Sequence, residues 1–132
     1  MAENNEILTI LSVDDDLINT KLLLRMLNRY TNIKEVITAV NGQDALDKLE
    51  KREDINLILL DIQMPVMTGM EFLDERANNN EKLANIPVIV LTTDETKKTE
   101  ALDKGATDFL AKPIREKLLF EKLDIIKELY ED

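Results

Sequence analysis

The stretch NLILLDIQMP, residues 56–65, runs four apolar residues directly into an acid, Asp61. A short apolar run of this kind, ended by a Met-Pro pair, predicts a β-strand that is covered on both faces. A carboxylate at the end of a buried strand is costly unless it meets water or polar partners. The partners of Asp61 should therefore be found elsewhere in the sequence.

Similar apolar runs alternate with amphipathic segments along the rest of the chain. The predicted strands are residues 7–13, 35–40, 56–61, 86–92 and 107–112. The predicted helices are residues 17–30, 43–52, 67–78, 95–104 and 114–130. Alternation of strand and helix produces a parallel sheet with right-handed crossovers and helices on both faces. We therefore predict an α/β fold, a doubly wound five-stranded parallel sheet in a three-layer sandwich.

The sequence of the first predicted helix indicates which of its sides is buried. Apolar spacings of three and four residues predict that Ile18, Leu22, Met26, Leu27 and Tyr30 share one side of it. Asp16, just before the helix, is a good N-cap. The sequence thus predicts an α-helix whose start is fixed by a capping carboxylate.

Bulk composition limits the domain count and the chemistry. The chain has 132 residues, which fits one domain at 7–132 after a flexible tail at 1–6. It has no cysteine and no histidine, which excludes disulfides, thiolate catalysis and the usual general base. The formal charge of −10 disfavours direct nucleic-acid binding. No membrane-spanning run or secretory leader is visible, so we expect no membrane insertion and a cytoplasmic location.

The carboxyl ends of the predicted strands carry the reactive side chains. These ends meet at one edge of a parallel sheet, where ligands bind. The residues expected there are Asp14, Asp15, Asp61, Thr92 and Lys112. Three neighbouring carboxylates resist ionising together, and a hard cation such as Mg²⁺ resolves the repulsion. A metal, a lysine and a hydroxyl around one carboxylate suit phosphoryl transfer to an aspartate nucleophile.

Four motifs in order carry a resemblance to a known family. They are VDDD at 13–16, LLDIQMP…TG at 59–69, VIVLTT at 88–93 and GATDFLAKP at 105–113. Over residues 7–130 the chain resembles the receiver domain of bacterial two-component response regulators. The resemblance implies a (βα)5 flavodoxin-like fold with strand order 2-1-3-4-5.

The resemblance also assigns a role to each residue of the acidic cluster. Asp61 matches the aspartate that accepts a phosphoryl group from a histidine kinase or a histidine phosphotransfer protein. Asp14 and Asp15 match the pair that holds Mg²⁺ together with Asp61. Gln63 matches the position whose backbone carbonyl binds the metal.

Three further positions match the residues that respond to phosphorylation. Thr92 matches the switch hydroxyl, Lys112 the lysine that contacts a phosphoryl oxygen, and Phe109 the switch aromatic. Thr93 departs from the family, which usually has a small residue there, so we expect it to narrow access to the phosphoryl group.

The resemblance implies a binding protein whose only catalysis is its own phosphorylation and dephosphorylation. An unidentified downstream protein is expected on the face formed by helix 95–104, strand 107–112 and helix 114–130. The oligomeric state is expected to be a monomer or a phosphorylation-dependent dimer. The chain fits a stand-alone regulator as well as a receiver cut from a longer protein.

Two other functions remain open on the sequence. A receiver-like module could signal through binding alone, without phosphorylation. A haloacid-dehalogenase-type phosphatase also uses an aspartate, Mg²⁺ and a lysine, but its nucleophile lies on the first strand. That motif is only half matched at 14–18, where Ile18 replaces Thr or Val, and it leaves Asp61 unexplained.

Overall fold

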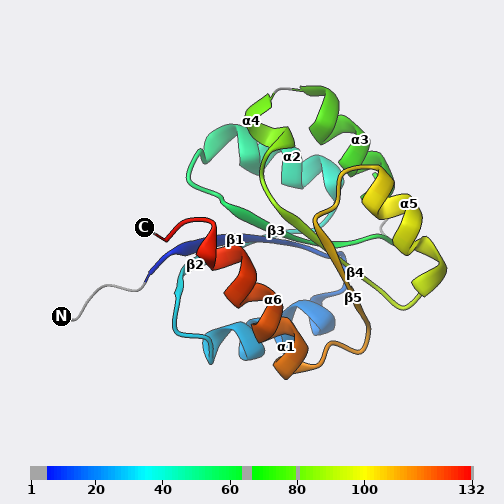
Figure 1. Cartoon of the computed structure of the whole chain (residues 1–132). Helices are drawn as coiled ribbons and strands as arrows, with labels where there is room; N and C mark the ends of the chain where they lie inside the picture. Colours follow the sequence, from blue (N-terminus) through cyan, green and yellow to red (C-terminus); the bar gives the residue numbers. More distant parts are fainter. Residues whose placement is uncertain (1–5, 64–66, 80, 132) are drawn as a thin grey trace.

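Five parallel strands form the centre of the molecule. The computed structural model describes residues 6–63, 67–79 and 81–131. The expected flexible tail therefore lies outside the described residues except for Glu6, and so do Met64 and Pro65. The strands are β1 (Leu8–Val13), β2 (Ile33–Ala39), β3 (Leu57–Asp61), β4 (Val88–Thr92) and β5 (Asp108–Ala111). Their order is β2-β1-β3-β4-β5, which confirms the predicted sheet (Figure 1).

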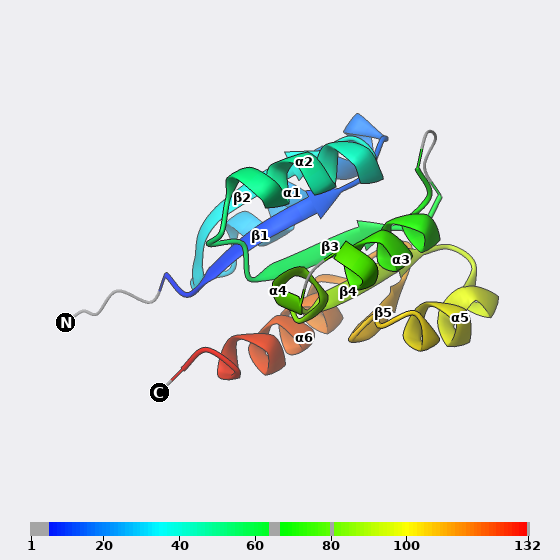
Figure 2. The ribbon, with the colours of Figure 1, turned by 90° about the horizontal axis from the view of Figure 1, so that it is seen from above.

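Helices cover both faces of this sheet. On one face lie α1 (Leu17–Asn28) and α6 (Glu116–Glu128). The other face is covered by α2 (Gly42–Lys51), α3 (Gly69–Asn79), α4 (Glu81–Ala84) and α5 (Lys98–Asp103). The short helix α4 was not predicted, and the helix predicted at 95–104 begins as a 3-10 turn, η1 (Glu95–Lys97). Figure 2 shows β1 and β3 side by side, with their carboxyl ends pointing the same way.

The apolar core is divided by the sheet into two clusters. Every residue of β1, β3 and β4 is buried, as the continuous apolar runs predict for central strands. Side chains point alternately to the two faces along each strand and so enter opposite clusters. In β1, Leu11 and Val13 pack toward α2–α5, whereas Leu8 and Ile10 pack toward α1 and α6.

The prediction for the buried side of α1 was partly wrong. Leu23 and Leu27 are buried, whereas Ile18 and Leu22 are 70% and 50% exposed. The cap was predicted correctly: the Asp16 side chain accepts hydrogen bonds from the backbone N–H groups of Ile18 at 2.8 Å and Asn19 at 3.2 Å. Tyr30 lies beyond the last helical residue and meets the Phe120 ring edge-to-face.

Within the described ranges, none of the helices has the length and apolar character that crossing a bilayer requires.

Candidate functional site

Two buried carboxylates lie at the ends of neighbouring central strands. Asp14 follows β1, and its Oδ1 accepts a hydrogen bond from the backbone N–H of Asp16 at 2.8 Å. Asp61 ends β3, and its Oδ1 accepts one from the backbone N–H of Gln63 at 3.2 Å. Each residue keeps only 7% of its surface exposed. The parallel pairing of β1 with β3 brings these strand ends together.

A third carboxylate completes a candidate cation site. Asp14, Asp15 and Asp61 each offer one oxygen, and these oxygens lie within 4.8 Å of one another. Asp15 is exposed, so the group opens to solvent on its side. A cluster of carboxylate oxygens is the donor set that a hard divalent cation prefers. The residues therefore fit a metal ion of this kind.

Lys112 supplies the positive charge of the site. Its Nζ lies 3.4 Å from Oδ2 of Asp14 and 3.4 Å from Oδ2 of Asp61. The backbone N–H of Lys112 donates to the Thr92 carbonyl at 2.8 Å, which extends the β4–β5 pairing to the site. The peptide bond to Pro113 is cis. One ammonium faces three carboxylates, so the cluster retains negative charge that attracts a cation.

The Asp61 carboxyl group is difficult to ionise in this environment. Burial raises its pKa to about 6, opposed by the attraction of Lys112 and reinforced by the repulsion of Asp14. A bound cation would stabilise the ionised form, which is the nucleophilic form. The protonation state of Asp61 would therefore respond to a cation bound at this cluster.

The two threonines at the carboxyl end of β4, Thr92 and Thr93, face different surroundings. Thr92 is buried, and its Oγ1 accepts a hydrogen bond from the backbone N–H of Asp94 at 3.0 Å. Thr93 is exposed and lines a cavity of about 260 Å³. The other residues lining this cavity are Asp15, Asp16, Asn19, Asp61, Gln63 and Lys112. Thr93 thus lies at the cavity that contains Asp61, and the narrowing of access by Thr93 stays a prediction.

Two cavity residues were not predicted as site residues. Asp16 was predicted at the end of the first strand and as a helix cap but not as a site residue, and no prediction was made for Asn19. Both belong to the start of α1, which follows the acidic triplet directly. The signal in the sequence is this adjacency, because the first turn of a helix that leaves a strand end lies beside that edge of the sheet.

Phe109 lies apart from the carboxylates. It is buried within the apolar cluster on the α2–α5 face and is paired with Val90 in the β4–β5 ladder. Its strand also leads to Lys112, three residues further on. The switch role of Phe109 stays a prediction.

Gly69 fixes the return of the chain to the sheet after Asp61. Its backbone N–H donates to the Ile62 carbonyl at 2.8 Å. A Cβ at this position would lie 2.6 Å from Cα of Ile62 and 2.7 Å from the carbonyl oxygen of Asp61. No residue larger than glycine fits against this backbone without displacing it. The Thr-Gly pair at 68–69 thus helps to position Asp61.

Fold and site together define a flavodoxin-like α/β protein with a candidate cation site, formed by acidic residues and a lysine, at the carboxyl edge of its sheet. The sequence model of the response regulator receiver domain matches residues 10–124. The chain belongs to this family and is a receiver domain of two-component systems.

Similar proteins agree with this assignment. The chain is 32% identical to the two-component response regulator ORR3 of Oryza sativa, over 80% of each protein. The structure of the Vibrio cholerae chemotaxis response regulator CheY4 matches with a TM-score of 0.80 and 32% identity, covering 91% of this chain and 98% of that one. The chain is also 38% identical to a protein-glutamate methylesterase/protein-glutamine glutaminase of Clostridium acetobutylicum, but spans only 36% of its length.

Proposed function

We propose that this receiver accepts a phosphoryl group on Asp61 from a histidine kinase or a histidine phosphotransfer protein. The observation that supports it most is the position of the Lys112 ammonium, which lies 3.4 Å from both Asp61 and Asp14 in a cluster of three carboxylates. If Lys112 contacted Asp61 alone, the contact could be explained as an ordinary structural ion pair. A lysine shared between a buried nucleophile and a cation site is suited to stabilising phosphoryl oxygens.

The chemistry is a substitution at phosphorus. An Asp61 carboxylate oxygen attacks the phosphorus of a phosphohistidine, the P–N bond breaks, and the imidazole leaves with the bonding electrons. Lys112 stabilises the negative charge on the transferred phosphoryl oxygens. Asp14, Asp15, Asp61 and the backbone carbonyl of Gln63 would hold Mg²⁺, which neutralises charge on the same oxygens when bound.

Phosphorylation then shifts the conformational equilibrium of the surface formed by η1–α5, β5 and α6. In our proposal the Thr92 hydroxyl donates a hydrogen bond to the phosphoryl group and no longer accepts one from the Asp94 N–H. The Phe109 side chain repacks in response. A downstream protein binds this surface. The receiver binds this downstream protein as a monomer or as a phosphorylation-dependent dimer.

The proposed setting is a cytoplasmic receiver domain at 7–132 that has no activity beyond its own phosphorylation and dephosphorylation. Relatives that include the hybrid signal transduction histidine kinase M of Dictyostelium discoideum support a kinase partner, although the chain spans 5% of that protein. The activity named for the methylesterase relative belongs to a protein of which this chain spans about a third.

The test is intact mass after incubation with acetyl phosphate, with and without Mg²⁺. We expect one added phosphoryl group that requires Mg²⁺ and is lost in Asp61→Asn. Asp47→Asn, an exposed carboxylate of α2, is the matched control and should be phosphorylated normally. Beryllofluoride mimics the phosphoryl group. Its binding, monitored by NMR, detects a working site even where the phosphoryl group hydrolyses before the mass can be measured.

Two results would contradict the proposal. Phosphorylation mapped to Asp14 would favour the phosphatase-type mechanism. Absence of both an added phosphoryl group and beryllofluoride binding would favour a module that acts through binding alone.

A further inference from the structure

The edge strand β2 presents backbone groups that face away from the sheet. The Ala39 carbonyl accepts a hydrogen bond from the N–H of Asp14 at 3.0 Å, so Ala39 faces β1. Backbone direction alternates along a strand, and Val36 and Thr38 therefore point their N–H and C=O groups outward. Outward-facing backbone groups that lack a partner are a template for an added strand.

The carboxyl-terminal half of this edge is already covered. Lys48 of α2 donates from Nζ to the Thr38 carbonyl at 2.6 Å. Asp44, in the first turn of the same helix, accepts from the N–H of Val40 at 3.0 Å. Among the described residues, the backbone of Val36 has no comparable partner. The free part of the edge is therefore short and centred on Val36.

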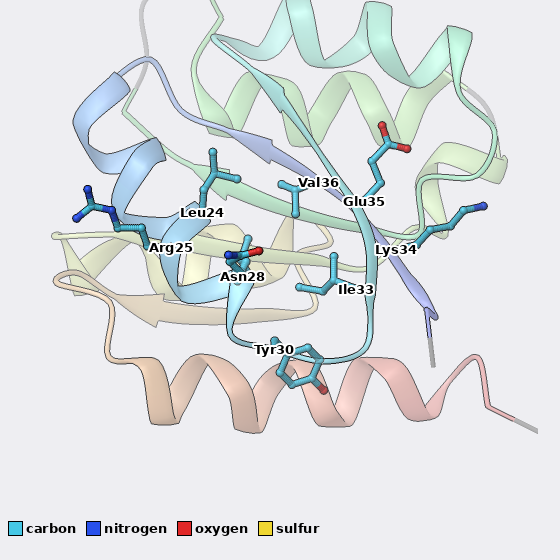
Figure 3. Close-up of a pocket in the computed structure, with 9 residues that line it drawn as sticks. Leu24, Arg25, Asn28, Tyr30, Ile33, Lys34, Glu35 and Val36 are labelled. Atoms are coloured by element: carbon cyan, nitrogen blue, oxygen red, sulfur yellow. The ribbon is translucent and has the colours of Figure 1, made fainter. Parts of the chain in front are cut away.

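A cavity of about 560 Å³ lies beside this free part. Its walls come from the second half of α1 and the first half of β2. Figure 3 shows Leu24, Ile33 and Val36 between the helix and the strand. Apolar side chains of a bound strand that point toward α1 would be buried against these residues.

The charged residues at this cavity favour an acidic ligand. Arg25 and Lys34 are exposed at opposite ends of it, and neither forms an ion pair within the described residues (Figure 3). Glu35 shares the Arg52 guanidinium with Asp54: Nη2 of Arg52 lies 2.8 Å from Oε1 of Glu35 and 2.8 Å from Oδ2 of Asp54. Two positive side chains, Arg25 and Lys34, and one negative one, Glu35, line this cavity, which favours negatively charged partners on a chain with formal charge −10.

We propose that this groove binds an extended, acidic segment of a partner protein. The segment adds a strand beside β2, with backbone hydrogen bonds to Val36 and carboxylates near Arg25 and Lys34. The pairing of β2 with β1 shifts register between Ile33 and Glu35, which keeps the added ladder short. The groove is separate from the cavity that contains Asp61, so this binding does not require phosphorylation.

The probe is a fluorescent, end-blocked octapeptide of alternating Glu and Val, titrated into the unphosphorylated full chain at low salt. We expect saturable anisotropy changes and amide NMR shifts concentrated at Lys34–Val36 and Arg25. The double variant Arg25→Glu/Lys34→Glu should weaken binding by about tenfold or more. Lys117, an exposed lysine of α6, forms no ion pair in the part of the chain that the structure describes, so Lys117→Glu is the control and should change affinity by less than about twofold.

Two further measurements separate strand addition from its alternatives. The same peptide with methylated backbone nitrogens keeps its charge but cannot donate hydrogen bonds, and we expect it not to bind. Equal binding of the methylated peptide, or shifts located elsewhere, would overturn the proposal. A wild-type dimer in sedimentation that Lys34→Glu dissociates would also overturn it, because the edge would then pair with a second copy of the chain.

Discussion

Asp61 experiences opposing influences from burial and from Lys112, and burial dominates. Its folded-state pKa of about 6 exceeds that of an unfolded aspartate. Its neutral form therefore contributes stability that is complete below the unfolded pKa, near 4. This contribution is lost as the pH rises through about 6.

This linkage predicts the effect of Asp61→Asn on stability. In Mg²⁺-free buffer at pH 7, the variant should have a free energy of unfolding about 1–3 kcal/mol higher than wild type. At pH 4 the difference should largely vanish, because wild-type Asp61 is then protonated. Urea unfolding of both proteins at the two pH values measures it. A pH-independent difference would show that ionisation of Asp61 is not its cause.

A second residue-scale prediction concerns the charge of Lys112. Lys112→Gln removes the only ammonium within 4.0 Å of Asp61 among the described residues. We expect phosphorylation by acetyl phosphate to slow by about 10²-fold or more, as for loss of one charge-stabilising donor. Timed intact-mass measurements give the rate, and Lys117→Gln is the control. An unchanged rate would remove Lys112 from the proposed mechanism.

The individual site residues were predictable to different extents. Asp14, Asp15, Asp61 and Lys112 stand at strand ends, and the parallel sheet alone brings strand ends together. Asn19 was missed, because its place in the cavity depends on the direction in which α1 leaves β1. The sequence also did not indicate that Lys112 contacts two carboxylates, because this depends on the distances between side chains in the folded chain.

At the scale of elements, the connection from β3 to α3 depends on one close backbone approach. Gly69→Ala would place a Cβ 2.6 Å from Cα of Ile62, so the loop after Asp61 must shift. We expect a loss of about 1–3 kcal/mol in the free energy of unfolding, as for other overpacked sites. Phosphorylation should slow as well. Ala77→Ser, exposed on the same helix, should change stability by less than about 0.5 kcal/mol.

The response of the β4–β5 region is the second prediction at this scale. Beryllofluoride should change the amide NMR shifts across Thr92–Lys112 in wild type. Thr92→Val keeps the shape of the side chain but removes the hydroxyl, and it should bind the mimic with smaller changes near Phe109. Unchanged wild-type spectra in this region would contradict the switch that we propose.

Element types were more predictable than element faces. The three central strands, β1, β3 and β4, were found because central strands read as continuous apolar runs. The inner side of α1 was misassigned because Leu22, Leu23 and Leu24 are consecutive, so periodicity does not select one stripe. Helix α4 was missed because four residues give no periodic signal.

For the whole molecule, the acidic cluster should couple metal binding to folding. A cation that binds only the folded state raises its stability by about 2.7 kcal/mol at 100 times the dissociation constant. We expect Mg²⁺ to raise the urea midpoint of wild type, whereas Asp14→Asn/Asp15→Asn should respond much less. NaCl at equal ionic strength is the control, and an equal response to NaCl would indicate general screening instead.

The division of the core by the sheet has a consequence for redesign. Among the described residues, the buried side chains under α1 and α6 and those under α2–α5 form two separate clusters on opposite faces of the sheet. A volume change in one compartment can therefore be compensated by neighbours within that compartment. A protein engineer can treat the two halves as separate repacking problems, and can alter one helical cover while the opposite one serves as an unchanged scaffold.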